Sequence, residues 1–267
     1  GSCGTNSLGS VFGAGNQAAY SGSPVVYIKN GTINNNVFGG GLGASAVVTG
    51  NPQVTVGNAT AGNSDYVHII GNVFGGGDAA NVEGSPSVTV NNCNTLVGTK
   101  DGEGAWIEAN GTVYGGGNAA HVTGGEHNNT NVTINGGDIY RVFGGGNGEV
   151  SPANVAGDAN TTIHGGNIHQ AFAGSNTQGA ISGTARISID HTSTCPEKID
   201  ELYGGGNLAA GGAGEVNIGC NAVLDDVYGG ANQADVSGDI TLNITGGTIG
   251  RAFGGNNKSG VIDGAIE

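Results

Sequence analysis

One short motif recurs along the whole chain and limits it to a small set of folds. The motif is an apolar residue, an aromatic residue, two or three Gly and usually Asn, as in Val113-Tyr114-Gly115-Gly116-Gly117-Asn118. Its copies are marked by nine aromatic anchors: Phe12, Phe38, Phe74, Tyr114, Phe143, Phe172, Tyr203, Tyr228 and Phe253. Most successive anchors lie 25 to 31 residues apart, with longer intervals of 36 and 40 before Phe74 and Tyr114. Such a period indicates a repeat architecture.

Each unit contains the anchor, a short apolar segment about eight residues later, and a segment of alternating apolar and polar residues such as Val88-Thr89-Val90. This alternation is typical of a half-buried strand. A unit of 25–29 residues is too small to fold alone, but stacked units bury a continuous core. The sequence therefore predicts an all-β fold: one parallel β-solenoid domain over residues 1–267, with about nine coils and three short strands per coil. Insertions are expected near 57–70 and 94–110.

The composition supports this prediction. Gly accounts for 57 of the 267 residues, and each Gly in a helix costs about 1 kcal/mol relative to Ala. In a solenoid, Gly permits tight corners, and the recurrent Asn can adopt a left-handed conformation or form a side-chain ladder. A β-propeller is the main alternative, but its blades have four strands and about 40–45 residues, which exceeds the unit found here.

The charge balance excludes several classes of partner. Lys and Arg number 7 against 21 Asp and Glu, for a formal net charge of −14, so the chain is not expected to bind nucleic acid. No apolar run approaches the ~18 residues of a membrane span, and no membrane insertion is expected. An acidic, sparsely charged surface favours an extracellular or cell-surface location.

Two of the four cysteines share one position in the repeat. Cys195 lies eight residues before Tyr203, and Cys220 lies eight before Tyr228. In adjacent coils these residues are expected about 5 Å apart, which suits a disulfide formed in an oxidising compartment. The alternative is a pair of stacked free thiols. Cys3 and Cys93 belong to coils too distant to pair with each other.

Four carboxylates are also brought together by the repeat. Asp200, Glu201, Asp225 and Asp226 lie two or three residues before adjacent anchors, so we expect them on one corner of the rod. A solvated acidic ladder, relieved by Arg141 and Arg251, is the favoured interpretation. Like charges stacked without counterions are destabilising, so a Ca²⁺ site is a second interpretation. A glycosidase-type carboxylate pair is a third. Calcium is the single cofactor that the sequence suggests.

Two aromatic residues outside the anchors are candidates for ligand binding. Trp106 lies in the insertion at 94–110, and Tyr66 lies in the insertion that precedes Phe74. Loops that project from a regular scaffold often carry binding residues, and Trp stacks on sugar rings. The alternative is a loop that folds back to cover the rod.

The Val-Phe/Tyr-Gly-Gly-Gly-Asn motif, with Gly-Gly-x-Ile turns such as Gly136-Gly137-Asp138-Ile139, resembles repeats of bacterial surface adhesins and autotransporter passengers. It is similar to polymorphic outer-membrane-protein repeats, because Phe253-Gly254-Gly255-Asn256 fits their Phe-x-x-Asn pattern. Most copies carry an extra Gly, and Gly-Gly-Ala-Ile does not occur. The resemblance implies a parallel β-helix and a surface location, and it transfers no catalytic residue.

We therefore expect a non-enzymatic, extracellular structural or adhesive β-solenoid segment of a bacterial surface protein. Open solenoid ends expose unpaired strand edges, so the chain is expected to be part of a longer array or to stack end to end into fibres. Its expected partners are further copies of itself and a host or bacterial surface glycan. The alternative is a carbohydrate-binding or polysaccharide-degrading β-helix that uses the acidic corner.

Overall fold

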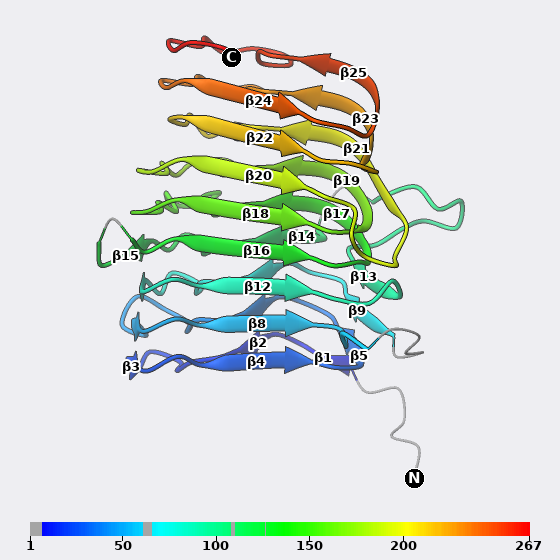
Figure 1. Ribbon diagram of the computed structural model, residues 1–267. Helices are drawn as coiled ribbons and strands as arrows, with labels where there is room; N and C mark the ends of the chain where they lie inside the picture. Colours follow the sequence, from blue (N-terminus) through cyan, green and yellow to red (C-terminus); the bar gives the residue numbers. More distant parts are fainter. Residues whose placement is uncertain (1–6, 61–65, 108–109, 126) are drawn as a thin grey trace.

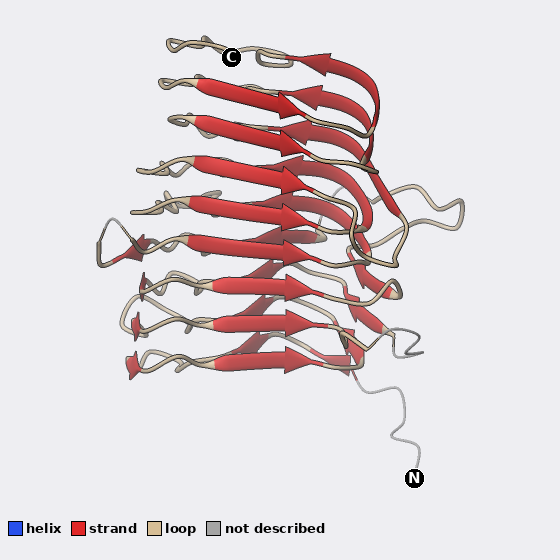
Figure 2. Cartoon of the chain, viewed as in Figure 1, coloured by secondary structure: helices blue, strands red, loops and turns tan. Residues whose placement is uncertain are grey.

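The computed structural model describes residues 7–60, 66–107, 110–125 and 127–267, and these residues form a rod of stacked β-coils (Figure 1). The described residues form 25 strands and no helix (Figure 2). Within these ranges no helix has the length and hydropathy that a membrane crossing requires. Every strand pair in the three sheets is parallel, which confirms the predicted parallel β-solenoid.

The first sheet is built by the segments of alternating residues, one from each of eight coils. It contains β4 (Val25–Ile28), β8 (Gln53–Val56), β12 (Ser87–Val90), β16 (Thr130–Ile134), β18 (Ala159–Ile163), β20 (Ala185–Ile189), β22 (Gly214–Ile218) and β24 (Ile240–Ile244). Pairing is in register, so that Val88 lies between Val54 and Val132. The alternate residues of each strand therefore form one continuous buried row.

The second sheet changes form along the rod. The first coils use two separate strands each: β1 (Ser7–Leu8), β5 (Gly31–Ile33), β9 (Val67–Ile69) and β13 (Thr95–Val97), followed by β2 (Val11–Phe12), β6 (Val37–Phe38), β10 (Val73–Phe74) and β14 (Thr112–Tyr114). Later coils use one long strand: β17 (Asp138–Phe143), β19 (Gly166–Phe172), β21 (Glu197–Tyr203), β23 (Val223–Tyr228) and β25 (Thr248–Phe253). Strand β17 pairs with both β13 and β14, so the two forms join in one sheet.

The third sheet is short. It contains β3 (Tyr20–Ser21), β7 (Val48–Thr49), β11 (Val82–Glu83) and β15 (Val122–Thr123), and it continues as single bridges from Val122 to Val155 and from Val155 to Ile181. Val82, Val122 and Val236 belong to the short apolar segments expected about eight residues after each anchor. The three sheets correspond to the three strands expected per coil, with the second sheet's strand split in two in the first coils and the third sheet's strand reduced to a bridge in later ones.

The nine anchors form one unbroken stack of rings beside the aliphatic core. Successive ring centroids lie 4.5 to 5.3 Å apart, with interplanar angles of 4° to 12°. The rings from Phe38 to Tyr228 are buried and form a cluster separate from the Val and Ile residues inside the coils. Each stacked pair contributes about 0.5–1.5 kcal/mol beyond the burial of its area. The predicted alignment of the repeat on its anchors is confirmed.

Close backbone approach explains the Gly residues that follow the anchors. A Cβ atom on Gly115 would lie 2.3 Å from the carbonyl oxygen of Gly144, and one on Gly144 would lie 2.3 Å from that of Ala173. Any larger residue at these positions would push neighbouring coils apart. Gly is thus required by the stacking itself.

An amide ladder runs along the rod next to the aromatic stack. Its members are Asp78, Asn118, Asn147, Asn176, Asn207, Asn232 and Asn257. In each step the Nδ2 of one Asn donates to the side-chain oxygen of the residue one coil below, over 2.8 to 3.1 Å. The predicted Asn ladder is therefore present, and it begins at Asp78 because Leu42 holds the position below.

Candidate functional site

The corner of the long strands carries two columns of polar side chains. One column contains Tyr140, His169, Asp200 and Asp225, and the other contains Arg141, Gln170, Glu201, Asp226 and Arg251. Strand register places Arg141 beside Gln170, Gln170 beside Glu201, Glu201 beside Asp226 and Asp226 beside Arg251. Alignment of the repeats on their anchors placed these residues correctly, because each position repeats at a fixed distance from its anchor.

Asp200 and Asp225 share one cation. Lys198 Nζ lies 2.9 Å from Asp200 Oδ1 and 2.7 Å from Asp225 Oδ2, and His169 Nδ1 lies 2.9 Å from Asp200 Oδ2. Partial burial would raise the pKa of Asp200, but the hydrogen bonds from His169 and Lys198 outweigh it and lower that pKa. Lys198 was not foreseen as a partner for this corner.

Glu201 and Asp226 have partners of their own. Glu201 Oε2 accepts hydrogen bonds from Gln170 Nε2 at 2.6 Å and from the Tyr203 hydroxyl at 2.9 Å. Asp226 forms two hydrogen bonds with the guanidinium of Arg251, which lower its pKa. In the described part of the chain no group of three or more His, Cys, Asp or Glu is arranged to hold a metal ion. The four carboxylates of the calcium interpretation are thus held separately: Lys198 lies between Asp200 and Asp225, Arg251 pairs with Asp226, and uncharged donors hold Glu201.

Trp106 covers the rod. Its ring packs against Tyr140, with 5.6 Å between centroids, and Lys100 Nζ lies 4.5 Å from its centroid. Lys100 also forms an ion pair with Asp138 at 2.9 Å. Trp106 thus packs on the rod, while residues 101–105 of the same loop are exposed and project from it (Figure 1). Tyr66 is 47% exposed and contacts His68, and part of its insertion (61–65) lies outside the described residues.

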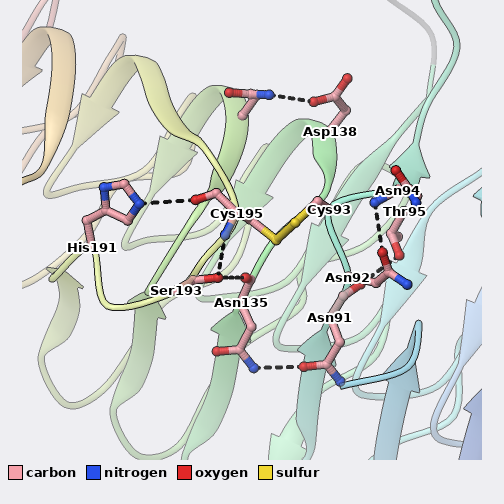
Figure 3. The surroundings of a disulfide bond; sticks show 11 residues. Asn91, Asn92, Cys93, Asn94, Thr95, Asn135, Asp138, His191, Ser193 and Cys195 are labelled. Atoms are coloured by element: carbon pink, nitrogen blue, oxygen red, sulfur yellow. Dashed lines mark hydrogen bonds between the residues drawn. A yellow bond between two sulfur atoms is a disulfide. The ribbon is translucent and has the colours of Figure 1, made fainter. Parts of the chain in front are cut away.

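The disulfide differs from the expected one. Cys195 is bonded to Cys93, with 5.2 Å between their Cα atoms (Figure 3). Cys220 is a free, exposed thiol. The expected pairing of Cys195 with Cys220 is therefore wrong. Cys3 lies outside the described residues.

Loop length explains the error. Residues 190–196 connect β20 to β21 with seven residues, whereas 219–222 connect β22 to β23 with four. The longer connection leaves its own coil and runs toward the N-terminal end of the rod (Figure 1). Ser193 Oγ donates to the Asn135 carbonyl at 2.5 Å, and a Cβ on Gly136 would lie 2.5 Å from Cys195 Sγ. The bond thus joins coils that are three apart in the first sheet, where β12, β16, β18 and β20 are successive neighbours.

A polar groove lies between the Arg141 column and the amide ladder. It encloses about 380 Å³, and its lining includes Arg141, Asn147, Glu149, Asn176, Asn207 and Leu208. We call it the corner groove. Tyr114 also lines it: burial raises the pKa of this phenol to about 12, and its hydroxyl donates to Asn147 Oδ1 at 3.0 Å. The sequence analysis missed the groove, although the alignment of Arg141 with the acidic column was a signal of it.

Arg141 is the unusual residue of the groove. Its Nε is buried and has no hydrogen-bond partner among the described residues, and its guanidinium carbon lies 4.8 Å from the centroid of the Tyr140 ring. The chain has two other arginines, Arg186 and Arg251, and both form ion pairs with carboxylates. Arg141 forms none with the acidic residues that the structure describes.

No protein-family model, curated protein or solved structure matches this chain.

Proposed function

We propose that this chain is a non-enzymatic, extracellular structural or adhesive segment of a bacterial surface protein, and that it stacks end to end with further copies of itself. The observation that carries the proposal is the unchanged chemistry of the terminal coil. Phe253 stacks on Tyr228 on one side and is still 43% exposed. A surface that matches the interior of the stack favours a further coil upon it.

The two ends of the rod have complementary chemistry. At the C-terminal end, Ile244, Phe253 and Ile266 are exposed, and Asn257 ends the amide ladder. At the N-terminal end, Phe12 begins the aromatic stack and Asn16 holds the corresponding ladder position. A second copy placed with its Phe12 over Phe253 would continue the aromatic stack at the spacing of the coils. It would also place Asn16 next to Asn257, before Leu42 interrupts the amide ladder.

The disulfide supports the extracellular part of the proposal. Stable disulfides form in oxidising compartments and are rare in the cytosol. The Cys93–Cys195 bond joins coils far apart in sequence, and it suits a rod that must resist unfolding without chaperones. A net charge of −14 also favours solubility at a cell surface over adhesion to anionic lipid.

Sedimentation velocity and electron microscopy over a range of concentrations test the stacking. We expect the wild type to form rods longer than one copy as its concentration rises, and we expect Phe253→Arg to stay monomeric. Val150→Arg is the matched control, because Val150 is exposed in a loop away from both ends. A wild type that is monomeric at every concentration would overturn the proposal, as would equal loss of assembly in the control.

No observation favours the alternative of a polysaccharide-degrading enzyme at the acidic corner. Each of its four carboxylates is held by a cation or by hydrogen-bond donors. A degradation assay on the wild type, Asp200→Ala and Asp226→Ala checks this point. We expect no activity in any of the three proteins.

A further inference from the structure

We propose that the corner groove binds an extended acidic glycan and that Arg141 holds one of its carboxylates. This inference gives a ligand class to the adhesive part of the proposed function and rests on that part, whereas end-to-end stacking is independent of it. The groove is built by residues from several successive coils, including Tyr114, Arg141, Asn176 and Asn207. It therefore runs along the rod axis.

The charge of the ligand follows from Arg141. The Nε–H of Arg141 is withdrawn from water and has no acceptor among the described residues, and a buried donor without an acceptor is destabilising. Arginine matches carboxylates with two parallel, charge-assisted hydrogen bonds, as Arg251 does with Asp226 in the same column. Arg141 is half-buried and lines the groove, so a carboxylate on the ligand would pair with its guanidinium from the groove.

The length of the ligand follows from the amide ladder. A primary amide has two N–H donors. Asn147 and Asn207 each use one of them in the ladder, toward Asn118 and Asn176, and the second has no partner among the described residues. These two residues are two coils apart, which corresponds to about 10 Å. A single sugar ring is too short to reach both donors, but a chain of several rings spans them.

The remaining lining residues suit a sugar chain. Glu149 lines the groove and is exposed, so its carboxylate can accept hydrogen bonds from ligand hydroxyls. Leu208 is also exposed in the groove and offers an apolar contact to a ring face. The protein as a whole is acidic, but charges more than about 8 Å away are largely screened at physiological ionic strength. Within the lining, Arg141 attracts an anion and Glu149 opposes it.

Isothermal titration calorimetry at 0.15 M salt tests the inference with a linear hexamer of galacturonic acid. Maltohexaose is the neutral probe of equal length, and free galacturonate is the monomeric probe. We expect the wild type to bind the acidic hexamer at least tenfold more tightly than either of the other two. Equal binding of maltohexaose would overturn the role of the carboxylate, and equal binding of free galacturonate would overturn the extended ligand. The inference also fails if the hexamer does not bind.

Three variants test the assignment of the residues. Arg141→Gln should weaken binding of the acidic hexamer at least tenfold. Arg251→Gln is the matched control from the same column outside the groove, and it should leave the affinity unchanged within twofold. Glu149→Gln removes a negative charge from the groove and should tighten binding two- to fivefold, which a merely disrupted fold would not do. An unchanged affinity in Arg141→Gln would overturn the inference.

The same titration on Phe253→Arg separates this inference from end-to-end stacking. We expect this monomeric variant to bind the hexamer as the wild type does. Failure of glycan binding with assembly intact would refute the groove assignment alone. Failure of assembly with glycan binding intact would refute the stacking alone.

Discussion

Cys93 and Cys195 are 102 residues apart in the sequence, yet a disulfide holds their Cα atoms 5.2 Å apart. The bond ties the connection between β20 and β21 to the turn that follows β12. It therefore fastens together coils that otherwise contact each other only through the coils between them.

Removal of this bond should destabilise the rod. Closing a loop of about 100 residues restricts the unfolded chain, and we expect Cys93→Ser/Cys195→Ser to lower the free energy of unfolding by about 2–5 kcal/mol. Chemical denaturation measures the loss. Cys220→Ser is the control and should have little effect, because Cys220 is an exposed free thiol. Peptide mapping that found Cys195 bonded to Cys220 would contradict the assignment.

A ring in the middle of the aromatic stack should contribute more to the free energy of unfolding than a ring at its end. Phe143 is fully buried between Tyr114 and Phe172, so Phe143→Ala should cost about 3–5 kcal/mol. Phe12 is partly exposed and stacks on Phe38 alone among the described rings, and Phe12→Ala should cost about 1–2 kcal/mol. Urea unfolding compares the two, and equal losses would argue against a continuous stack.

Each inner member of the amide ladder should contribute to the stability of the fold. Asn176→Ala would leave Asn147 Oδ1 without one donor and Asn207 Nδ2 without its acceptor. We expect a loss of about 1–3 kcal/mol in the free energy of unfolding. Asn243 forms a similar bond to Asn217 on the exposed face, where water replaces a lost partner, so Asn243→Ala should cost under about 0.5 kcal/mol. The opposite order would show that ladder burial is unimportant.

Glu197 should make stability depend on pH. This carboxyl is 6% exposed, and its Oε2 has no hydrogen-bond partner among the described residues. Burial raises its pKa above the ordinary Glu value, although the Val223 N–H partly opposes the shift. The folded state thus binds this proton more tightly than the unfolded state, and its contribution to the free energy of unfolding falls as pH rises between the two pKa values.

Glu197→Gln should remove that pH dependence. At pH 4 the variant and the wild type should have similar stability, because the wild-type carboxyl is then largely protonated. At pH 7 the variant should be more stable by on the order of 1 kcal/mol. Denaturation of both proteins at both pH values gives the stability difference between variant and wild type at each pH. Other titrating groups contribute equally to both proteins and cancel in this difference. A variant less stable than the wild type at pH 7 would contradict this account.

The anchors and the corner columns could be predicted because they depend on the repeat alone. Once coils stack in register, residues equally distant from Phe172 and Tyr203, such as Gln170 and Glu201, must become neighbours. The same rule failed for Cys195, because a connection three residues longer than its equivalent leaves the coil. Stacking determines the positions of the strands, but it does not determine the paths of the loops between them.

The corner groove could not be predicted from the sequence, for a different reason. The repeat alignment placed Arg141 in a column with Glu201 and Asp226. It gave no sign that Lys198 pairs with Asp200 and Asp225, or that Arg141 forms no ion pair with the described acidic residues. Which side chains pair between columns depends on their length and orientation. The position of a residue in the repeat gives neither. Trp106 likewise needed the position of Tyr140 before its role could be assigned.

The hydrogen bonds of the amide ladder all point the same way, from each Asn toward the residue beneath it, and they end on the carboxylate of Asp78. Aligned amides add their dipoles, and an anion at the N–H end stabilises such a row, as it does at the N-terminus of a helix. The row is therefore directional, with its N–H end closed by Asp78 and its last carbonyl at Asn257. A head-to-tail filament keeps this direction from rod to rod, whereas a symmetric dimer reverses it at the junction.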